Sequence, residues 1–192
     1  MGSGVRLYNP LAVRRHLIAL AAAEDEGQGT ASANALAEIR TRQTRRGLER
    51  ILVSGKSAEA RKRAAWALGF LHDEEATRTL LRTLADRNEE TDVRAYAAEA
   101  LGHIAPQARH DEALAALLHA LTDRAPEIRF WAAFALGNLG DERAIPALQR
   151  LADRDSDSVP GWWSIRKEAL DSIEQIRLIR RNRGGPSDVD GA

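Results

Sequence analysis

Apolar residues recur at helical spacing along most of the chain, and two kinds of segment alternate. Segments of the first kind are rich in leucine, and each ends in Ala-Asp-Arg or Thr-Asp-Arg before a polar turn. They are "EEATRTLLRTLADR" (74–87), "DEALAALLHALTDR" (111–124) and "DERAIPALQRLADR" (141–154). No run of β-branched residues alternates over the ~4–8 positions that a strand would need. The pattern therefore predicts helices and no sheet.

Segments of the second kind share an Ala-Leu-Gly core. They read "ARKRAAWALGFL" (60–71), "VRAYAAEALGHI" (93–104) and "IRFWAAFALGNL" (128–139), and their glycines lie 33 and 35 residues apart. A fourth copy, "IRKEALDSIEQI" (165–176), has Glu174 in the glycine position, and "SANALAEI" (32–39) has Ala37 there. Earlier members of the first kind are "PLAVRRHLIALAAAEDE" (10–26) and "RQTRRGLERILVSG" (42–55). A period of this length is typical of repeat arrays, so the chain is expected to contain about five helix-turn-helix repeats.

Most of the repeated residues have structural roles. Paired alanines allow neighbouring helices to approach closely while they keep a high helix propensity. A glycine near a helix end costs roughly 1 kcal/mol relative to alanine, so its repetition indicates a close contact or a helix stop. Arginine recurs near the start of the same helix, in three cases a short distance after Asp86, Asp123 or Asp153, and we interpret these residues as an Arg/Asp ladder that connects successive turns. These arginines are Arg61, Arg94, Arg129 and Arg166.

The pattern V/I-R-x-x-A-A-x-A-L-G-x-I/L followed by D-E-x-A-x-x-x-L resembles the short HEAT-like repeats of the phycobilin-lyase type. The resemblance is clear over residues 58–155 and weaker over the rest of 10–180. It implies an all-α fold, a right-handed α-solenoid of HEAT-like repeats. It also implies that the helix bearing Ala-Leu-Gly lines the concave surface and that the leucine-rich helix lies on the convex side.

Within this register, several positions are not needed by the repeat framework. They lie seven, six and three residues before the glycine and one after it, and those at −7 and −3 share one helical face. Six of the nine aromatic residues of the chain occupy such positions in three consecutive repeats. We predict a partner-binding surface made of Lys62, Arg63, Trp66, Phe70, Tyr96, Glu99, His103, Phe130, Trp131, Phe134 and Asn138.

The members of this surface differ in how well packing alone explains them. Trp131 and Tyr96 lie near the helix seam and are as well explained by framework packing as by binding. Trp66, Phe130 and Phe134 are surplus to a core already filled by alanine and leucine, which favours binding. A polar rim is expected from the charged and polar members, namely Glu99, Lys62, Arg63 and His103. In the enlarged turn at 153–167, Trp162 and Trp163 either cap the solenoid or extend the ligand surface.

Composition narrows the function classes. Lys+Arg and Asp+Glu both number 28, so the formal net charge is zero and no global attraction to nucleic acid or anionic membrane follows. Cysteine is absent, which excludes disulfides and thiolate chemistry. No apolar run reaches the ~18 residues of a membrane span, and no signal-peptide pattern opens the chain, so a cytoplasmic location is expected.

Candidate catalytic chemistry is sparse. His72 and His110 stand in "HDE" strings, but the same Asp-Glu occurs without histidine in "GDERA", where it caps the next helix. No nucleophile motif, phosphate loop or dinucleotide fingerprint occurs. We therefore expect no metal and no cofactor. Two basic stretches, 40–50 and 176–183, carry arginines that could contact phosphates, yet solvated helix faces explain them better and nucleic-acid binding is not expected. These arginines include Arg45, Arg46, Arg180 and Arg181.

The sequence thus predicts one solenoid domain over residues 10–183, a flexible N-terminus over 1–9 and a disordered tail over 184–192. The predicted function is that of a non-enzymatic adaptor that binds a protein or peptide on its concave face. A lyase-like subunit or chaperone that handles a bilin or another prosthetic group is the enzymatic alternative, and a nucleic-acid-binding repeat protein is the third. Fold alone leaves the partner and the oligomeric state open.

Overall fold

The computed structural model describes residues 9–25, 27, 29–103 and 110–183, and these form ten α-helices and one short 3-10 helix. The helices are α1 (Pro10–Ala21), α2 (Thr30–Glu38), α3 (Arg42–Ser54), α4 (Ala58–Gly69), α5 (Glu74–Ala85), α6 (Thr91–Leu101), α7 (His110–Ala120), α8 (Pro126–Leu139), η1 (Glu142–Ala144), α9 (Ile145–Arg154) and α10 (Ile165–Arg183). Within the described residues there is no strand, only an isolated antiparallel bridge between Ser158 and Ser164. The all-α prediction is confirmed.

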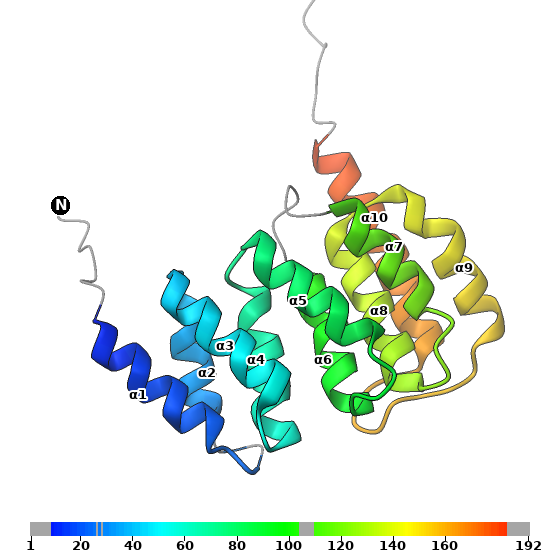
Figure 1. Cartoon of the computed structure of the whole chain (residues 1–192). Coiled ribbons are helices and arrows are strands. Elements are labelled where there is room, and N and C mark those ends of the chain that lie inside the picture. The colour runs from blue at the N-terminus through cyan, green and yellow to red at the C-terminus, as the bar shows by residue number, and fades with distance from the viewer. Residues whose placement is uncertain (1–8, 26, 28, 104–109, 184–192) are drawn as a thin grey trace, which may run out of the picture.

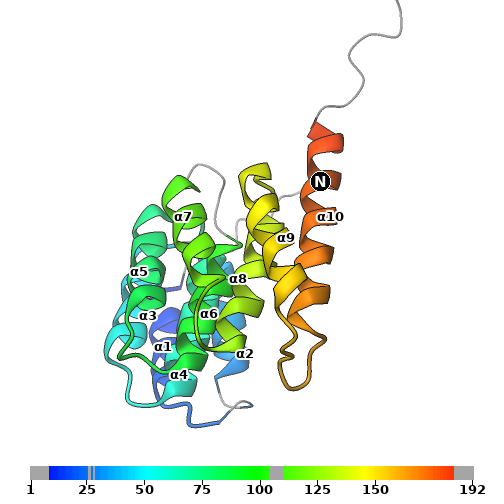
Figure 2. The ribbon, with the colours of Figure 1, turned by 90° about the vertical axis from the view of Figure 1, so that its right-hand side faces the viewer.

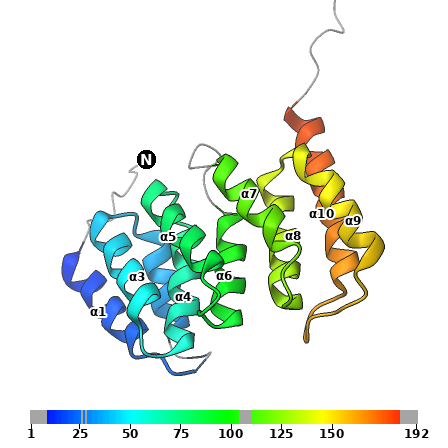
Figure 3. The same ribbon diagram turned by 45° about the vertical axis from the view of Figure 1, so that its right-hand side comes forward.

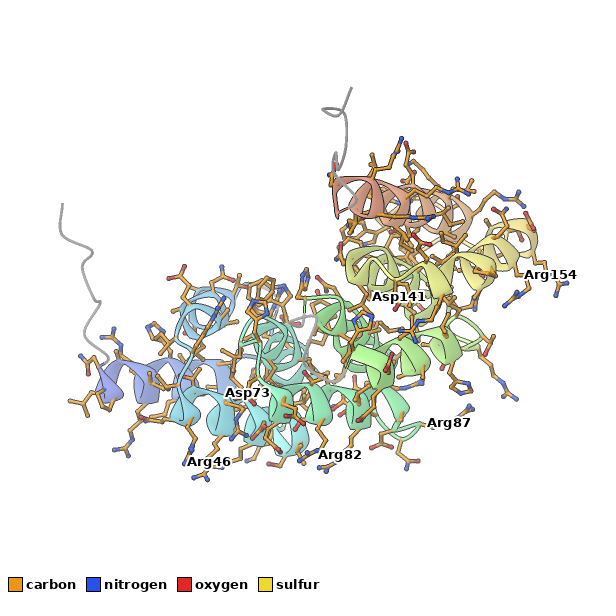
Figure 4. All side chains as sticks on the ribbon, turned by 90° about the horizontal axis from the view of Figure 1, so that it is seen from above. Arg46, Asp73, Arg82, Arg87, Asp141 and Arg154 are labelled. Atoms are coloured by element: carbon orange, nitrogen blue, oxygen red, sulfur yellow. The ribbon has the colours of Figure 1, made fainter. Side chains whose placement is uncertain are left out.

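The helices form five antiparallel pairs stacked in chain order as an α-solenoid (Figures 1 and 3). The odd-numbered helices make one layer and the even-numbered helices make the other, and α10 runs alongside α9 at the C-terminal end (Figure 2). Seen from above, the stack bends, so that α8, α9 and α10 turn out of the line of α1, α3 and α5 (Figure 4). The even-numbered helices lie inside this bend and are called the inner helices; the odd-numbered ones are the outer helices.

Helix starts follow from local sequence. Asn9, Thr41, Ser57 and Asp73 each precede a helix in extended conformation and accept hydrogen bonds from backbone N–H groups of its first turn. Proline in the first turn, as at Pro146, removes an N–H that has no helical partner. The Asp of the "HDE" string at 72–74 is therefore a helix cap, as expected.

The recurrent glycines set how closely the inner helices approach one another. A Cβ added to Gly69 would lie 2.7 Å from the carbonyl oxygen of Ala100, and one added to Gly102 would lie 2.7 Å from the Cα of Ala135. Gly137 meets Ser172 of α10 in the same way. Each glycine thus faces the residue two positions before the next glycine position. The predicted close contact is the reason for the glycine, because alanine cannot fit there.

The repeated arginines form the expected ladder. Arg94 binds the backbone oxygen of Leu84 at 3.0 Å and the carboxylate of Asp123 at 2.7 Å. Arg129 binds the backbone oxygen of Asp123 and the carboxylates of Asp155 and Asp157, the last two at 2.6 Å. Each of these side chains therefore joins the turn before its own helix to the turn of the next repeat. Planar guanidinium groups suit such multiple contacts.

Arg61 makes the same connection through Gly55 and Glu89, whereas Arg166 in α10 is exposed. The acids of the ladder are Glu89, Asp123 and Asp155. Sequence spacing named Asp86 and Asp153 as well, and that part was wrong: Asp86 accepts from the backbone of Asn88, and Asp153 accepts from Gln149.

The predicted domain ends lie mostly outside the described residues. Residues 1–8 of the predicted flexible N-terminus and all of the predicted tail, 184–192, are not described. One hydrophobic cluster runs through the described helices from Val13 to Ile176.

Candidate functional site

Aromatic rings form a continuous row across the inner helices, beginning on α4. Trp66 and Phe70 lie one turn apart on this helix, with ring centroids 4.6 Å apart. Phe70 stacks at 4.6 Å on the imidazole of His103, which lies two residues beyond the end of α6. His103 in turn meets Phe134 of α8 edge-on at 6.2 Å. Four rings from three successive repeats thus touch one another.

The row continues along α8 into the turn before α10. Phe134 meets Trp131 at 5.5 Å, and Trp131 meets Trp162 at 5.0 Å, both in T-shaped geometry. Trp162 contacts Trp163 at 5.6 Å, and these two indoles remain 47% and 43% exposed. We call the whole row the aromatic strip; it consists of Trp66, Phe70, His103, Phe134, Trp131, Trp162 and Trp163.

Phe130 does not belong to this surface, which corrects the sequence interpretation. Its side chain is only 1% exposed and lies beneath Trp131, Trp162 and Trp163, with centroid distances of 5.2, 5.8 and 6.0 Å. The turn between α9 and α10 folds back over α8 and covers Phe130. That turn is an insertion relative to the other repeats, so their register could not reveal the cover. Trp162 and Trp163 thus cover the core at Phe130 and continue the row of aromatic rings; that they extend a ligand surface stays a prediction.

The turn is held in place by α10. The indole Nε1 of Trp163 donates to Oε2 of Glu168 at 2.8 Å, and the ammonium group of Lys167 lies 5.1 Å from the Trp163 ring centroid. Glu168 is 4% exposed, and the hydroxyl of Ser172 shares its single proton between Oε1 of Glu168 at 3.2 Å and the backbone oxygen of Ala133 in α8 at 2.9 Å. Burial raises the pKa of Glu168, and the hydrogen bonds from Trp163 and Ser172 oppose this effect only in part.

Lys62, Arg63 and Tyr96 form a cluster beside the strip. Lys62 and Arg63 both pair with the buried carboxylate of Glu59, at 2.8 and 2.7 Å. Their cationic groups also lie over the ring of Tyr96, at 5.5 and 6.0 Å from its centroid. Burial raises the pKa of Glu59, but the hydrogen bonds from the two cations outweigh it, so the pKa lies below its usual value. The cationic groups of Lys62 and Arg63 and the ring of Tyr96, all predicted to contact a partner, therefore already interact with residues of this protein.

Glu99, assigned to the polar rim by the sequence, is partly buried on α6, which packs between α4 and α8. It stands on α6 in the repeat position held by Trp66 on α4 and by Phe134 on α8. Burial raises the pKa of Glu99 to about 7, and the positive charge of Arg63 opposes this only weakly. His103, one turn further on, has its pKa lowered by burial and by the charge of His72.

The two ends of the surface differ. Asn138 accepts a hydrogen bond from Gln175 at 2.8 Å, so it bridges α8 to α10 instead of standing free. At the other end, Trp66 and Phe70 border an open groove of about 650 Å³ between α2 and α4. Sequence reasoning did not find this groove, because its other wall lies in the degenerate first repeat. That wall is formed by Asn34, Ala37, Glu38 and Arg40.

The remaining candidate chemistry is limited. The described residues contain no cluster of three or more His, Cys, Asp or Glu side chains suited to hold a metal ion, and His110 pairs with Asp141 at 2.9 Å. Among these residues no helix combines the length and apolarity needed to cross a bilayer. In the basic stretches, Arg45 pairs with Glu49, and Arg180 pairs with Glu142. Arg46 points away from the inner helices, on the outer side of the bend with Arg82, Arg87 and Arg154 (Figure 4).

Comparison with known families agrees with this architecture. The model of the PBS lyase HEAT-like repeat matches residues 60–86, and the model of HEAT repeats matches residues 81–166. The chain contains HEAT-like repeats over these residues. No curated protein matches this HEAT-like repeat protein over its sequence.

Solved structures show the same fold at low sequence identity. A chain of the complex of CpcE and CpcF of phycocyanin lyase from Nostoc sp. PCC7120 superposes with a TM-score of 0.69 at 18% identity; the match covers 85% of this HEAT-like repeat protein and 99% of that chain. A chain from the complex of Kap95p with RanGDP gives 0.61 at 16% identity over 86% of this protein and 24% of that chain. A designed armadillo repeat protein in complex with the peptide (KR)4 gives 0.51 at 20% identity, over 83% and 80%.

Proposed function

We propose that this HEAT-like repeat protein is a non-enzymatic adaptor that binds a protein or peptide on the inner side of its bend, with the aromatic strip as the anchoring surface. The observation that carries the proposal is the unbroken ring contact from Trp66 to Trp163, with both terminal tryptophans partly open to solvent. Aromatic rings provide large contact areas with few rotatable bonds, and they dominate the binding energy of many interfaces.

The rigidity of the strip supports a binding role. Its rings are carried by helices whose spacing is fixed by the glycine contacts and the arginine ladder, and its C-terminal end is fixed to α10 through Glu168. A surface that is ordered before binding loses little conformational entropy when the partner docks. The structures of CpcE with CpcF, of Kap95p with RanGDP, and of the designed protein with its peptide are complexes on the same fold.

The test is affinity capture from the native host with the full chain as bait. We expect one recurrent polypeptide that the double variant Trp131→Ala/Phe134→Ala no longer retains, while its helicity by circular dichroism is unchanged. Val53→Ala is the matched control, since Val53 is an apolar residue that is 74% exposed on the outer helix α3. Equal recovery with the double variant would remove the strip from the binding site.

A second candidate function is that of a lyase-like subunit or chaperone that holds a bilin. A flat conjugated ligand could stack on the same rings, and the likeness to the phycocyanin lyase chain extends over nearly all of that chain. The test is the absorbance of phycocyanobilin on titration with the protein. A shifted band that the Trp131→Ala/Phe134→Ala variant abolishes supports this candidate, and an unchanged spectrum contradicts it.

Nucleic-acid binding makes a third, separate prediction. Neutralised phosphates release counterions, so such binding would weaken steeply with salt. The inner surface carries both signs of charge, from Lys62 and Arg63 to Glu99, and the expectation remains that duplex DNA and single-stranded RNA do not bind at moderate ionic strength.

A further inference from the structure

The carboxylate of Glu99 is partly buried and lacks a close partner. Within the described part of the chain it accepts no hydrogen bond and makes no ion pair; Arg63 and Tyr96 interact with it only electrostatically, at longer range. A carboxylate removed from water without a partner destabilises the protein. The raised pKa of Glu99 is a second sign of this uncompensated burial.

The nearby cations are already committed to another acid. Lys62 and Arg63 both hold Glu59 at salt-bridge distance, and both lie over Tyr96. Glu59 is 7% exposed, so breaking its two pairs to satisfy Glu99 would leave a more deeply buried charge uncompensated. In the free protein, Lys62 or Arg63 could therefore pair with Glu99 only by breaking a salt bridge to Glu59, which would destabilise the fold.

The repeat register places several aromatic residues around the position of Glu99, next to the cluster of Lys62 and Arg63. Tyr96 lies three residues before it on the same face of α6, and His103 lies four residues after it, in the turn that follows the helix. Trp66 and Phe134 hold the same repeat position on the two flanking helices, α4 and α8. An acid ringed by aromatic side chains suits a cation, because the ring faces and the carboxylate attract positive charge together.

We infer that Glu99 is the pairing site for a lysine or arginine side chain of a bound peptide, so that the partner is a segment with one basic residue set among apolar ones. This inference rests on the proposed function, since it assumes that a peptide lies on the aromatic strip. In this arrangement the rings of the aromatic strip contact the apolar residues of the peptide, and Glu99 pairs with its basic residue. Within this division the rings supply affinity, and Glu99 fixes the register of the segment.

The test is selection from a phage-displayed library of random 12-residue peptides on the immobilised full chain. The baits are the wild-type protein, Glu99→Gln, and the control Glu174→Gln, which neutralises an exposed acid on α10. The wild-type and control baits are expected to enrich peptides with lysine or arginine at one fixed position between apolar residues. With Glu99→Gln, the requirement at that position should disappear.

Affinity measurements on the best selected peptide complete the test. We expect Glu99→Gln to weaken binding about tenfold, as for loss of a charge-assisted hydrogen bond, and replacement of the basic residue by norleucine to weaken it equally. The two changes together should cost no more than either alone, because they remove the same contact. Additive losses, or selected peptides without a fixed basic residue, overturn the inference.

Failure of the proposed function has a different signature. If the selected peptides bind the Trp131→Ala/Phe134→Ala variant as tightly as the wild type, the aromatic strip is not their site. If no peptide is enriched at all, the proposed peptide-binding function fails, and the role of Glu99 fails with it. Peptides that need the strip but tolerate Glu99→Gln contradict the role of Glu99 alone.

Discussion

The indole N–H of Trp163 is bonded to the carboxylate of Glu168, and this 2.8 Å contact fixes the turn between α9 and α10 to the last inner helix. Glu168 stands in the repeat position that Trp131 holds on α8 and Tyr96 on α6. The last repeat therefore replaces an aromatic residue by an acid, and the turn supplies the indole instead. The aromatic strip therefore ends at Trp163, whose ring comes from the turn, while the matching position of α10 holds the acid that binds it.

Trp163→Phe is expected to destabilise the protein by about 1–2 kcal/mol, because the buried Glu168 loses a hydrogen-bond donor while most of the ring contact is kept. Chemical denaturation measures this change. Trp162→Phe is the control, since no hydrogen bond of its indole to a described residue is present. Equal losses for the two variants would show that ring area, and not the bond to Glu168, holds the turn.

Glu99→Gln is expected to stabilise the protein in a pH-dependent way. The pKa of Glu99 rises from 4.5 to about 7 in the folded state, so the folded protein binds more protons than the unfolded chain between these values. Stability therefore falls as the pH rises from about 4.5 to about 7, and the Gln variant lacks this loss. At pH 8 the gain should be on the order of 1–3 kcal/mol, and it should shrink toward pH 4.

The measurement is the free energy of unfolding of both proteins from pH 4 to pH 8. Glu174→Gln, at an exposed position, should give a flat difference over the same range. A Glu99→Gln difference that does not change with pH would show that Glu99 is solvated or paired in solution.

His72→Gly should stabilise the turn between α4 and α5. His72 has a φ of +52°, a left-handed conformation that costs a non-glycine residue roughly 1 kcal/mol, and the equivalent position of a later repeat is Gly140, with φ +68°. Thermal unfolding of His72→Gly and His72→Ala separates the effect of the backbone conformation from the effect of removing the imidazole side chain. Alanine keeps the unfavourable φ, so a gain of the same size with alanine would contradict the conformational explanation.

Gly102→Ala is expected to cost more than about 2 kcal/mol, because the new Cβ would meet backbone of Ala135 at 2.7 Å and the inner helices would have to separate. Gly161→Ala is the comparison: its φ of +81° is unfavourable, but nothing lies within 4 Å of the added Cβ. The loss there should stay near 1 kcal/mol. Because Gly102 has an ordinary helical φ of −73°, equal losses would mean that the inner helices accommodate the added methyl group and that their close approach does not require the glycine.

Arg129→Met should destabilise the protein by about 2 kcal/mol or more, since it leaves the nearly buried carboxylate of Asp155 without the guanidinium that binds it at 2.6 Å. Arg166→Met alters the same repeat position in the last helix, where the side chain is exposed, and should change stability by less than about 0.5 kcal/mol. Urea denaturation of both variants tests the ladder. A small effect of Arg129→Met would show that the ladder contributes little.

The sequence alone determined the repeat, and through it most of the fold. Apolar periodicity predicted the helices. The recurring glycines predicted close contacts between neighbouring inner helices, which the structure shows at Ala100 and Ala135. These features could be predicted because they depend on residues within one repeat or on the same position of the next. The resulting register also brought Trp66, Phe70 and Phe134 to the inner helices, where their rings join through His103.

Only the tertiary structure decided which of these residues face solvent and which lie beneath others. Phe130 was predicted at the surface, but a turn more than twenty residues later in the chain covers it with Trp162 and Trp163. Glu99 was assigned to a rim by the sequence, and only the packing of α4, α6 and α8 shows that it is partly buried, with a pKa raised to about 7. Burial depends on which segments pack against each other in space. The turn that carries Trp162 and Trp163 is an insertion outside the repeat, so the repeat register could not predict which residues it covers.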